Sequence, residues 1–294
     1  MSIILTCETS ADLEWEEYQK LSVDYIPTTT IINGEHIKGD PKVFDVSDMY
    51  RQMREGAKVS TSQVNIGEYE DKFRTILSAG NDLLHISMAS GMSGSYAAAC
   101  AAAEEMRKEF PDRIIEVTDG RMVSSGYGMI VEKMAEMRDQ GASIYEMKEW
   151  NETHRLEMQS RLYIPNLKWV VAGGRVSKTI GFIGGAFGLC FVMCSDVNGY
   201  PKYVRKIRHK KAAIRELVQE AEDLADGGLA YNGRMRIAHG DVLEDALALK
   251  EQVEQTFHHL SGEIKITQIG PMIGAHTGPG TVSLFFRGKP GQRA

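Results

Sequence analysis

Hydrophobic and polar positions follow a repeating order of strand, loop and helix through the first half of the chain. The apolar or β-rich runs that predict strands cover residues 3–7, 25–32, 83–86 and 113–118. The segments with helical spacing or helix-forming composition cover residues 12–21, 47–55, 65–79, 97–109, 124–139 and 143–159. This alternation predicts a mainly parallel sheet with helices on both of its faces.

Local signals mark several of the boundaries. Asn33-Gly34 closes the run at 25–32 as a hairpin turn. Asn65 precedes Glu68, and Ser143 precedes Glu146, by the three residues typical of a helix capping box. Residues 59–63 are predicted to be a polar loop. The buried stripe of the helix that starts at Asn65 is predicted to consist of Ile66, Tyr69, Phe73, Ile76 and Leu77.

The pattern changes near residue 160. A glycine-dense segment at 181–188 leads into two predicted strands that flank the turn Asn198-Gly199. The remaining elements are predicted as strands at 189–194, 203–207, 235–239, 263–269 and 281–286 and helices at 210–223 and 242–257. Because 294 residues are many for one core, we predict two α/β domains, at residues 1–160 and 161–294.

Composition and charge exclude several classes of function. A formal net charge of −6 argues against nonspecific nucleic-acid binding, and no apolar run reaches the length of a membrane span. The first residues lack the basic lead of a signal peptide, and only four cysteines occur, which together predict a cytoplasmic protein with reduced thiols. Cys190 and Cys194 have a metal-ligand spacing without a second pair nearby, so we expect buried thiols there and no metal.

The serine-rich turn Ser90-Gly91-Met92-Ser93-Gly94-Ser95 joins a predicted strand to a predicted helix. The start of a helix exposes unpaired N–H groups at the positive end of its dipole, and serine hydroxyls add hydrogen bonds. This turn is therefore a candidate site for a small anionic group such as a carboxylate. The alternative is an ordinary serine cap.

Further polar candidates lie elsewhere in the chain. Thr61 and Ser62 are ordinary turn residues unless they meet Ser93, and Arg175 after two glycines either binds an anion or forms a structural salt bridge. His276, in His276-Thr277-Gly278-Pro279-Gly280, either donates to an anion or bonds locally within a turn. The basic run between Lys202 and Lys211 is a solvated face or a docking site for an acidic partner.

A serine-dependent hydrolase, with Ser93 as nucleophile and His276 as base, is the alternative enzymatic hypothesis. The nucleophile elbow Gly-x-Ser-x-Gly is incomplete, however, because Ser95 stands where its second glycine belongs. Neither a Rossmann nor a Walker phosphate loop occurs, so the sequence gives no support for nucleotide binding.

Taken together, several segments resemble the DegV family, in the family's order and across nearly the whole chain. They are Thr9-Ser10-Ala11-Asp12-Leu13, Thr61-Ser62-Gln63, Ser90-Gly91-Met92-Ser93-Gly94-Ser95-Tyr96, Gly173-Gly174-Arg175-Val176-Ser177, Arg208-His209-Lys210-Lys211-Ala212 and Gly274-Ala275-His276-Thr277-Gly278-Pro279-Gly280. The resemblance implies two α/β domains, the second with a mixed sheet, and a long-chain fatty acid held between them. It also implies a non-catalytic protein without a cofactor, which presents the acid to a separate ATP-dependent fatty acid kinase.

The resemblance also assigns the site. It implies that Thr61 and Ser93 hold the carboxylate, and Ser62 and Gly94 of the same two loops are also expected among the carboxylate-binding residues. Arg175, His276 and Thr277 lie near this head group. The chain departs from the family pattern at Cys7 and Glu8, where Thr and Asp are usual, and after Gly188, where a proline is missing. A module that binds a different amphiphile remains a further alternative.

Overall fold

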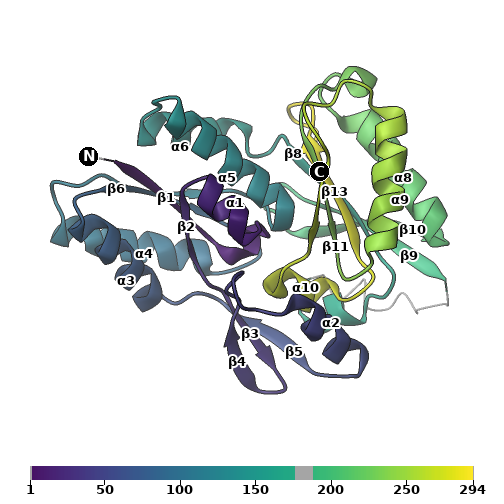
Figure 1. Cartoon of the computed structure of the whole chain (residues 1–294), viewed down its shortest axis with the longest axis horizontal. Coiled ribbons are helices and arrows are strands. Elements are labelled where there is room, and N and C mark those ends of the chain that lie inside the picture. Colours follow the sequence, from purple (N-terminus) through teal and green to yellow (C-terminus); the bar gives the residue numbers. More distant parts are fainter. Residues whose placement is uncertain (1, 176–187, 294) are drawn as a thin grey trace.

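The computed structural model describes residues 2–175 and 188–293, so most of the glycine-dense segment at 181–188 lies outside the described residues. Within them the chain forms three sheets (Figure 1). Sheet A is the parallel sheet, with strand order β2-β1-β6-β7, and confirms the predicted parallel arrangement. Its strands are β1 (Ile3–Glu8), β2 (Val23–Ile26), β6 (Asp82–Ser87) and β7 (Ile115–Asp119).

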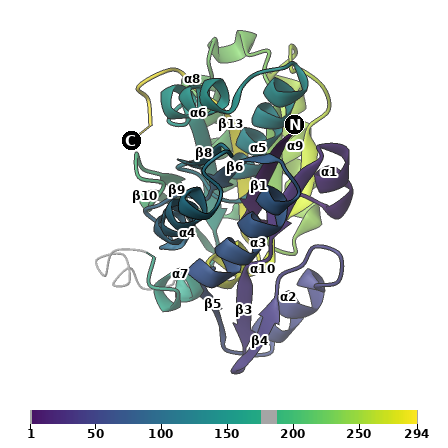
Figure 2. The same ribbon diagram turned by 90° about the vertical axis from the view of Figure 1, so that its left-hand side faces the viewer.

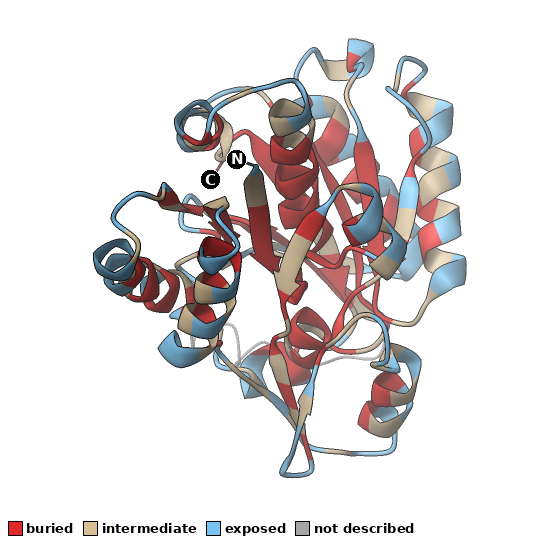
Figure 3. Cartoon of the chain, turned by 60° about the vertical axis from the view of Figure 1, so that its left-hand side comes forward, coloured by how far each residue is buried: buried red, intermediate tan, exposed pale blue. Residues whose placement is uncertain are grey.

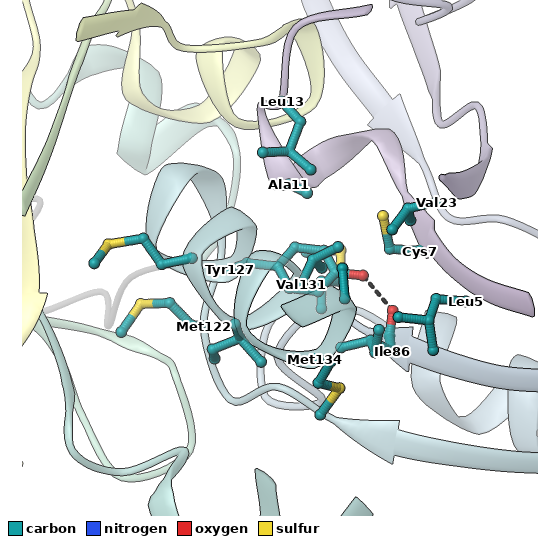
Figure 4. Close-up of a cluster of buried hydrophobic side chains, with 14 of the residues drawn as sticks. Leu5, Cys7, Ala11, Leu13, Val23, Ile86, Met122, Tyr127, Val131 and Met134 are labelled. Carbon is teal, nitrogen blue, oxygen red and sulfur yellow. Dashed lines mark hydrogen bonds between the residues drawn. The ribbon is translucent and has the colours of Figure 1, made fainter. Parts of the chain in front are cut away.

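Helices cover both faces of sheet A, as predicted. Buried side chains of α3 and α4 pack on one face, and those of α1, α5 and α6 pack on the other. These helices are α1 (Trp15–Lys20), α3 (Ile66–Ser78), α4 (Ser95–Glu109), α5 (Ser124–Asp139) and α6 (Ile144–His154). Figure 4 shows Leu5, Cys7 and Ile86 of the sheet against Tyr127 and Val131 of α5.

Sheet C is mixed, as expected for the second half of the chain. Its strand order is β10-β9-β8-β13-β11-β12, in which β11 and β12 pair in parallel and the other pairs are antiparallel. The strands are β8 (Met158–Ile164), β9 (Leu189–Ser195), β10 (Pro201–Arg208), β11 (Met235–His239), β12 (Lys265–Gln268) and β13 (Val282–Arg287). Because β8 spans residues 160 and 161, the division into domains at that point stays a prediction.

Helices α8 (Lys210–Leu224) and α9 (Leu243–Thr256) cover one face of sheet C, next to the short 3₁₀ helix at Gly228–Ala230. The other face lies against α5, which therefore stands between sheets A and C (Figure 1). An ion cluster joins the two halves here: buried Arg236 of β11 contacts Glu17 of α1 and Glu132 of α5, and Lys265 of β12 contacts the same two carboxylates. Buried residues accordingly fill α5 and the central strands of sheets A and C, and the outer faces of the covering helices are exposed (Figure 3).

The small antiparallel sheet B, with order β4-β3-β5, differs from the prediction in two ways. The run at 25–32 is two strands in different sheets, β2 in sheet A and β3 (Thr29–Ile32) in sheet B, because Pro27 interrupts it. The predicted loop at 59–63 is strand β5 (Val59–Ser62), which pairs with β3. The hairpin at Asn33-Gly34 to β4 (Glu35–Lys38) is confirmed, with φ values of 51° and 92°.

Several predicted helix boundaries were wrong. The helix expected at 12–21 is a 3₁₀ turn (Thr9–Ala11) followed by α1, since Asp12 adopts a left-handed φ of 50° between them. The helix expected to reach 159 ends at His154, because the next residues enter β8. Ile66 occupies the first position of α3 and is 45% exposed, so it does not belong to the buried stripe.

Three shorter helices gather with sheet B at one end of the molecule (Figure 2). These are α2 (Val46–Arg54), α7 (Lys168–Ala172) and α10 (Pro271–Thr277). Helix α10 was not predicted, since Gly270-Pro271 and the glycines after His276 favour a turn; Pro271 instead occupies the first helical turn, where its missing N–H costs nothing. Helix α10 carries His276 to the end of sheet B that holds Thr61.

Candidate ligand-binding site

The serine-rich turn has the predicted place between a parallel strand and a helix. The turn follows the carboxyl end of β6 and leads into α4. Within it, the Ser93 hydroxyl accepts a hydrogen bond from the backbone N–H of Ser95 at 3.2 Å and lies 2.9 Å from the Ser95 hydroxyl. The side chain of Asp119, at the end of the neighbouring strand, accepts the backbone N–H of Ser90 at 3.1 Å. The turn is thereby fixed at the edge of sheet A, where ligands of parallel sheets bind.

Thr61 and His276 meet although 215 residues separate them. Thr61 Oγ1 on β5 lies 2.8 Å from His276 Nε2 on α10. His276 packs closely on Gly173, the residue that ends α7: a Cβ atom at that position would lie 2.2 Å from His276 Nδ1. The contact is therefore a long-range one between three elements, and the local turn that was the alternative for His276 does not form.

These residues surround a small cavity. Its polar lining consists of Thr61, Gln63, Ser93, Arg175 and His276, and its apolar lining of Met88, Met92, Met272 and Ile273. Arg175 is the only lining residue with a permanent charge among the described residues. Its guanidinium donates to the Gly173 carbonyl at 2.7 Å. A cavity with hydroxyls and one guanidinium is suited to an anion.

His276 is uncharged at neutral pH in this setting. Burial, followed by the proximity of Arg175, lowers the pKa of His276 to about 4. Among the described residues Nδ1 has no hydrogen-bond partner. The geometry does not assemble a hydrolytic triad, because His276 contacts Thr61 while Ser93 pairs with Ser95, and no described carboxylate bonds Nδ1.

The other candidate residues lie beside the small cavity. Ser62 donates to the Gln63 carbonyl at 3.2 Å, and Gly94 caps α4 beneath the Gln63 side chain. Thr277 donates to the Ile273 carbonyl at 3.1 Å and lines a second, larger cavity. Val176 and Ser177 lie outside the described residues. Gln63 and the four apolar lining residues were not predicted to line the site. The only signal for them in the sequence was that Met88 and Met92 lie beside and within the serine-rich turn.

The larger cavity lies between α5, α10 and sheet C. Its walls are mostly apolar and include Met92, Val123, Leu162, Ile164, Val170, Met193, Ile269, Ile273 and Phe285. Met92, Arg175, Ile273 and His276 line both cavities. The polar small cavity therefore adjoins the larger, mostly apolar one.

Glu8, one of the departures from the family pattern, lies in neither cavity lining. Its fully buried carboxylate accepts five donors, which are the hydroxyls of Tyr69, Ser87 and Tyr127, the His85 ring and the Met88 backbone N–H. Burial alone raises the pKa of Glu8, but His85 and the tyrosine hydroxyls outweigh it and lower the pKa to about 2. Since Met88 opens the serine turn, Glu8 anchors the start of that turn.

Asp12 is a second buried carboxylate, with the opposite behaviour. Its Oδ2 accepts a hydrogen bond from Ser124, which lines the larger cavity, whereas its Oδ1 has no hydrogen-bond partner among the described residues. Burial raises the pKa of Asp12 to about 7, and the Ser124 and Gly270 groups offset only part of that rise. Between the ordinary pKa of an aspartate and about pH 7, Asp12 therefore keeps its proton in the folded protein, whereas the unfolded chain has released it.

The Asp12 proton predicts a stability that falls as the pH rises. Between about pH 4 and about pH 8 this group lowers the free energy of unfolding by about 4 kcal/mol, because only the folded state keeps the proton. We expect Asp12→Asn to remove this part of the pH dependence of the free energy of unfolding. Urea unfolding of both proteins across this range measures the difference; parallel curves would contradict the expectation.

The predicted basic run and the cysteines have ordinary surroundings. The run follows the edge strand β10 and the start of α8, where Arg205 pairs with Glu216 and Lys210 with Asp245. Cys190 and Cys194 are buried and unbridged, as predicted. In the two described segments no group of three or more potential ligands could hold a metal ion, and no helix is both long and apolar enough to cross a membrane.

Comparisons with known proteins show what the chain resembles. The sequence profile described as "uncharacterised protein, DegV family" matches residues 2–289. DegV domain-containing proteins of Clostridium perfringens and Lactococcus lactis are each 29% identical over 286 residues, covering 97% of this chain and 97% of theirs.

Solved structures share the fold. A Thermotoga maritima protein reported to bind fatty acid superposes with a TM-score of 0.84 at 22% identity, covering 98% of this chain and all of that one. The Streptococcus pneumoniae fatty acid kinase B3 protein, loaded with linoleic acid, gives 0.84 at 18% identity with the same coverage. The DegV fatty-acid-binding protein of Bacillus subtilis gives 0.82 at 22% identity, again with that coverage.

Proposed function

This chain belongs to the DegV family, and on that premise we propose that it binds a long-chain fatty acid, with the carboxylate in the small cavity and the acyl chain in the larger one. The observation that supports the proposal most strongly is that the two cavities adjoin, with Met92, Arg175, Ile273 and His276 in the walls of both. One end offers hydroxyls and a guanidinium, and the remainder offers mostly apolar walls.

The energetics of an amphiphile agree with this division. A buried carboxylate is unfavourable unless charged or hydrogen-bonding partners surround it, and Thr61, Ser93 and Arg175 are such partners. Each buried methylene contributes about 0.8 kcal/mol, so most of the affinity comes from the chain and the polar end sets the orientation. His276 orients the Thr61 hydroxyl at 2.8 Å. Ser62, Gly94 and Thr277 support the loops and helix that carry these residues.

We further propose that the protein presents the bound acid to a separate ATP-dependent fatty acid kinase and needs no cofactor of its own. The chain carries no recognised ATP-binding loop. Gln63 borders the small cavity and also a hollow at the starts of α3 and α4, so the carboxylate lies one side chain away from that hollow. A kinase partner can approach the carboxylate from this side.

Native mass spectrometry of protein purified from bacteria tests the binding. The expected result is a mass increment that denaturation releases as a long-chain fatty acid, whereas an amphiphile of another class identifies the alternative. A clean apo mass with no uptake of added oleic acid would exclude the proposed function. Trapping an acyl phosphate as its hydroxamate, after addition of ATP and a DegV-linked kinase, tests the presentation step separately.

Ser93→Ala is expected to weaken fatty-acid binding by about 1–3 kcal/mol, because the buried carboxylate loses a hydrogen-bond donor. Isothermal titration with oleic acid measures the effect. Ser90→Ala is the matched control, since Ser90 lies in the same turn but does not line the small cavity. Equal affinity of the folded Ser93 variant and the wild type would remove Ser93 from the site.

A further inference from the structure

The larger cavity contains a polar spot that a simple hydrocarbon chain does not require. Ser160 of β8, Ser195 of β9 and Ser283 of β13 line the cavity on adjacent strands of sheet C, and all three are buried. In the register, Ser160 lies opposite Phe285, and Ser283 lies opposite Leu162 two residues further along β8. The three hydroxyls thus form one patch on the same face of the sheet.

The hydrogen bonds of this patch leave donors unused. Ser160 Oγ accepts the backbone N–H of Ser195 at 3.1 Å, and the two hydroxyl oxygens lie 2.8 Å apart. One of the two hydroxyl hydrogens forms the bond between Ser160 and Ser195. For the other hydroxyl hydrogen, the described residues offer only a weak acceptor, the Met122 sulfur, 4.0 Å from Ser195 Oγ. Among the described residues Ser283 Oγ has no hydrogen-bond partner.

The remaining hydroxyls of the cavity wall are engaged. Ser124 donates to Asp12, and Thr277 donates to the Ile273 carbonyl. Among the hydroxyls of the described lining, the unused donors therefore belong to the serine patch. Buried hydroxyls without partners are unfavourable, so a hydrocarbon chain against the patch leaves that penalty in place, whereas a ligand oxygen relieves it.

The patch follows β8 back from the end of that strand. Ile164, at the end of β8, packs with Val170 of α7, and α7 ends at Gly173 against His276. Ser160 is four residues back along the same strand, about 13 Å from Ile164 at the usual rise per residue. Ser283 lies opposite Leu162, two residues back, so the patch extends along the cavity wall that an acyl chain would follow.

We infer that this cavity selects long-chain fatty acids that carry an oxygen, a hydroxyl group above all, along the acyl chain. The inference rests on the proposed function and narrows its ligand class. Hydroxyls of the serine patch exchange hydrogen bonds with that oxygen, and the surrounding apolar walls hold the hydrocarbon.

Ricinoleic acid and oleic acid form the matched test pair, because they differ only by a hydroxyl in the distal half of the chain. Wild-type protein is expected to bind ricinoleic acid at least as tightly as oleic acid. The triple variant Ser160→Ala, Ser195→Ala, Ser283→Ala is expected to weaken ricinoleic acid about tenfold relative to oleic acid. Isothermal titration of the full chain, stripped of copurified lipid, gives both constants.

Oleic acid binding reports folding in every variant. Ser125→Ala is the control, because its buried hydroxyl bonds Thr267 at 2.7 Å outside the cavity lining, and it should leave the ratio of the two constants unchanged. If the triple variant does not fold, Ser283→Ala alone should shift the ratio about threefold. A tenfold wild-type preference for oleic acid, or a ratio that the serine variants leave unchanged, overturns the inference. Failure to bind either acid instead overturns the proposed function.

Discussion

Glu8→Gln is expected to lower the free energy of unfolding by about 3 kcal/mol, although it removes only a charge and keeps the shape of the side chain. All five contacts of the carboxylate are donors, at 2.6–3.2 Å. If the glutamine amide points its NH2 group toward Met88, two donors face each other where the Met88 N–H formerly donated to the carboxylate at 3.0 Å. The opposite rotamer is worse, since it turns the NH2 group toward Tyr69, His85 and Ser87.

Tyr127 limits the loss. Its hydroxyl contacts the Ile86 carbonyl (Figure 4) and also Glu8. It can therefore donate to Ile86 and accept from an amide. The Met88 N–H is part of the backbone and has no such freedom. The loss therefore concentrates where β6 passes into the serine turn.

Urea unfolding at neutral pH measures the Glu8 effect, with Glu35→Gln on the exposed strand β4 as control. The pH dependence gives a second readout. With a folded pKa of about 2, Glu8 stabilises the protein above its ordinary pKa, and this contribution is lost as the pH falls toward 2. The variant should lack that acid-side loss; an unchanged urea midpoint would show that the carboxylate network contributes little.

Gly173→Ala is expected to reduce fatty-acid affinity at least tenfold while leaving the fold intact. Gly173 has an ordinary helical φ of −70°, so alanine introduces no backbone strain there. The new methyl group would instead lie 2.2 Å from His276 Nδ1 and 3.1 Å from its Cγ. The imidazole must move, and its 2.8 Å contact with Thr61 breaks. The carboxylate then loses an oriented hydroxyl in a buried cavity.

A double-mutant cycle with His276→Ala separates this mechanism from a general disturbance. If Gly173→Ala acts through the imidazole, it has little further effect once the imidazole is absent. Oleic acid titration of the four proteins gives the coupling, and thermal unfolding reports the fold. Additive losses would show that the methyl group disturbs the site by another route.

Local sequence signals predicted much of the fold because the interactions behind them are local. Asn65 with Glu68, and Ser143 with Glu146, form the predicted capping boxes, and the chain turns at Asn33-Gly34. Each of these features depends on residues no more than a few positions apart. The same local signals misplaced residues 59–63, since a short polar segment becomes a strand only when β3 supplies its hydrogen-bond partners.

The candidate site was predicted as separate pieces, and the tertiary structure decided how they meet. Thr61 and Ser93 were assigned by resemblance, and both line the small cavity together with Arg175 and His276. Gln63 was missed in that role because nothing within its own segment shows that it lies over Gly94. The carboxylate and acyl roles of these residues stay predictions until binding is measured.

By itself the sequence determined the alternation of strands and helices, the turns and caps, and the family to which the chain belongs. Only the tertiary structure decided that β5 exists, that α10 carries His276 to Thr61, and that Glu8 faces five donors away from the cavities. The physical reason is the range of the interactions. Capping and turn geometry are encoded within a few residues, whereas a cavity and a buried carboxylate depend on side chains that only the packing of distant segments brings together.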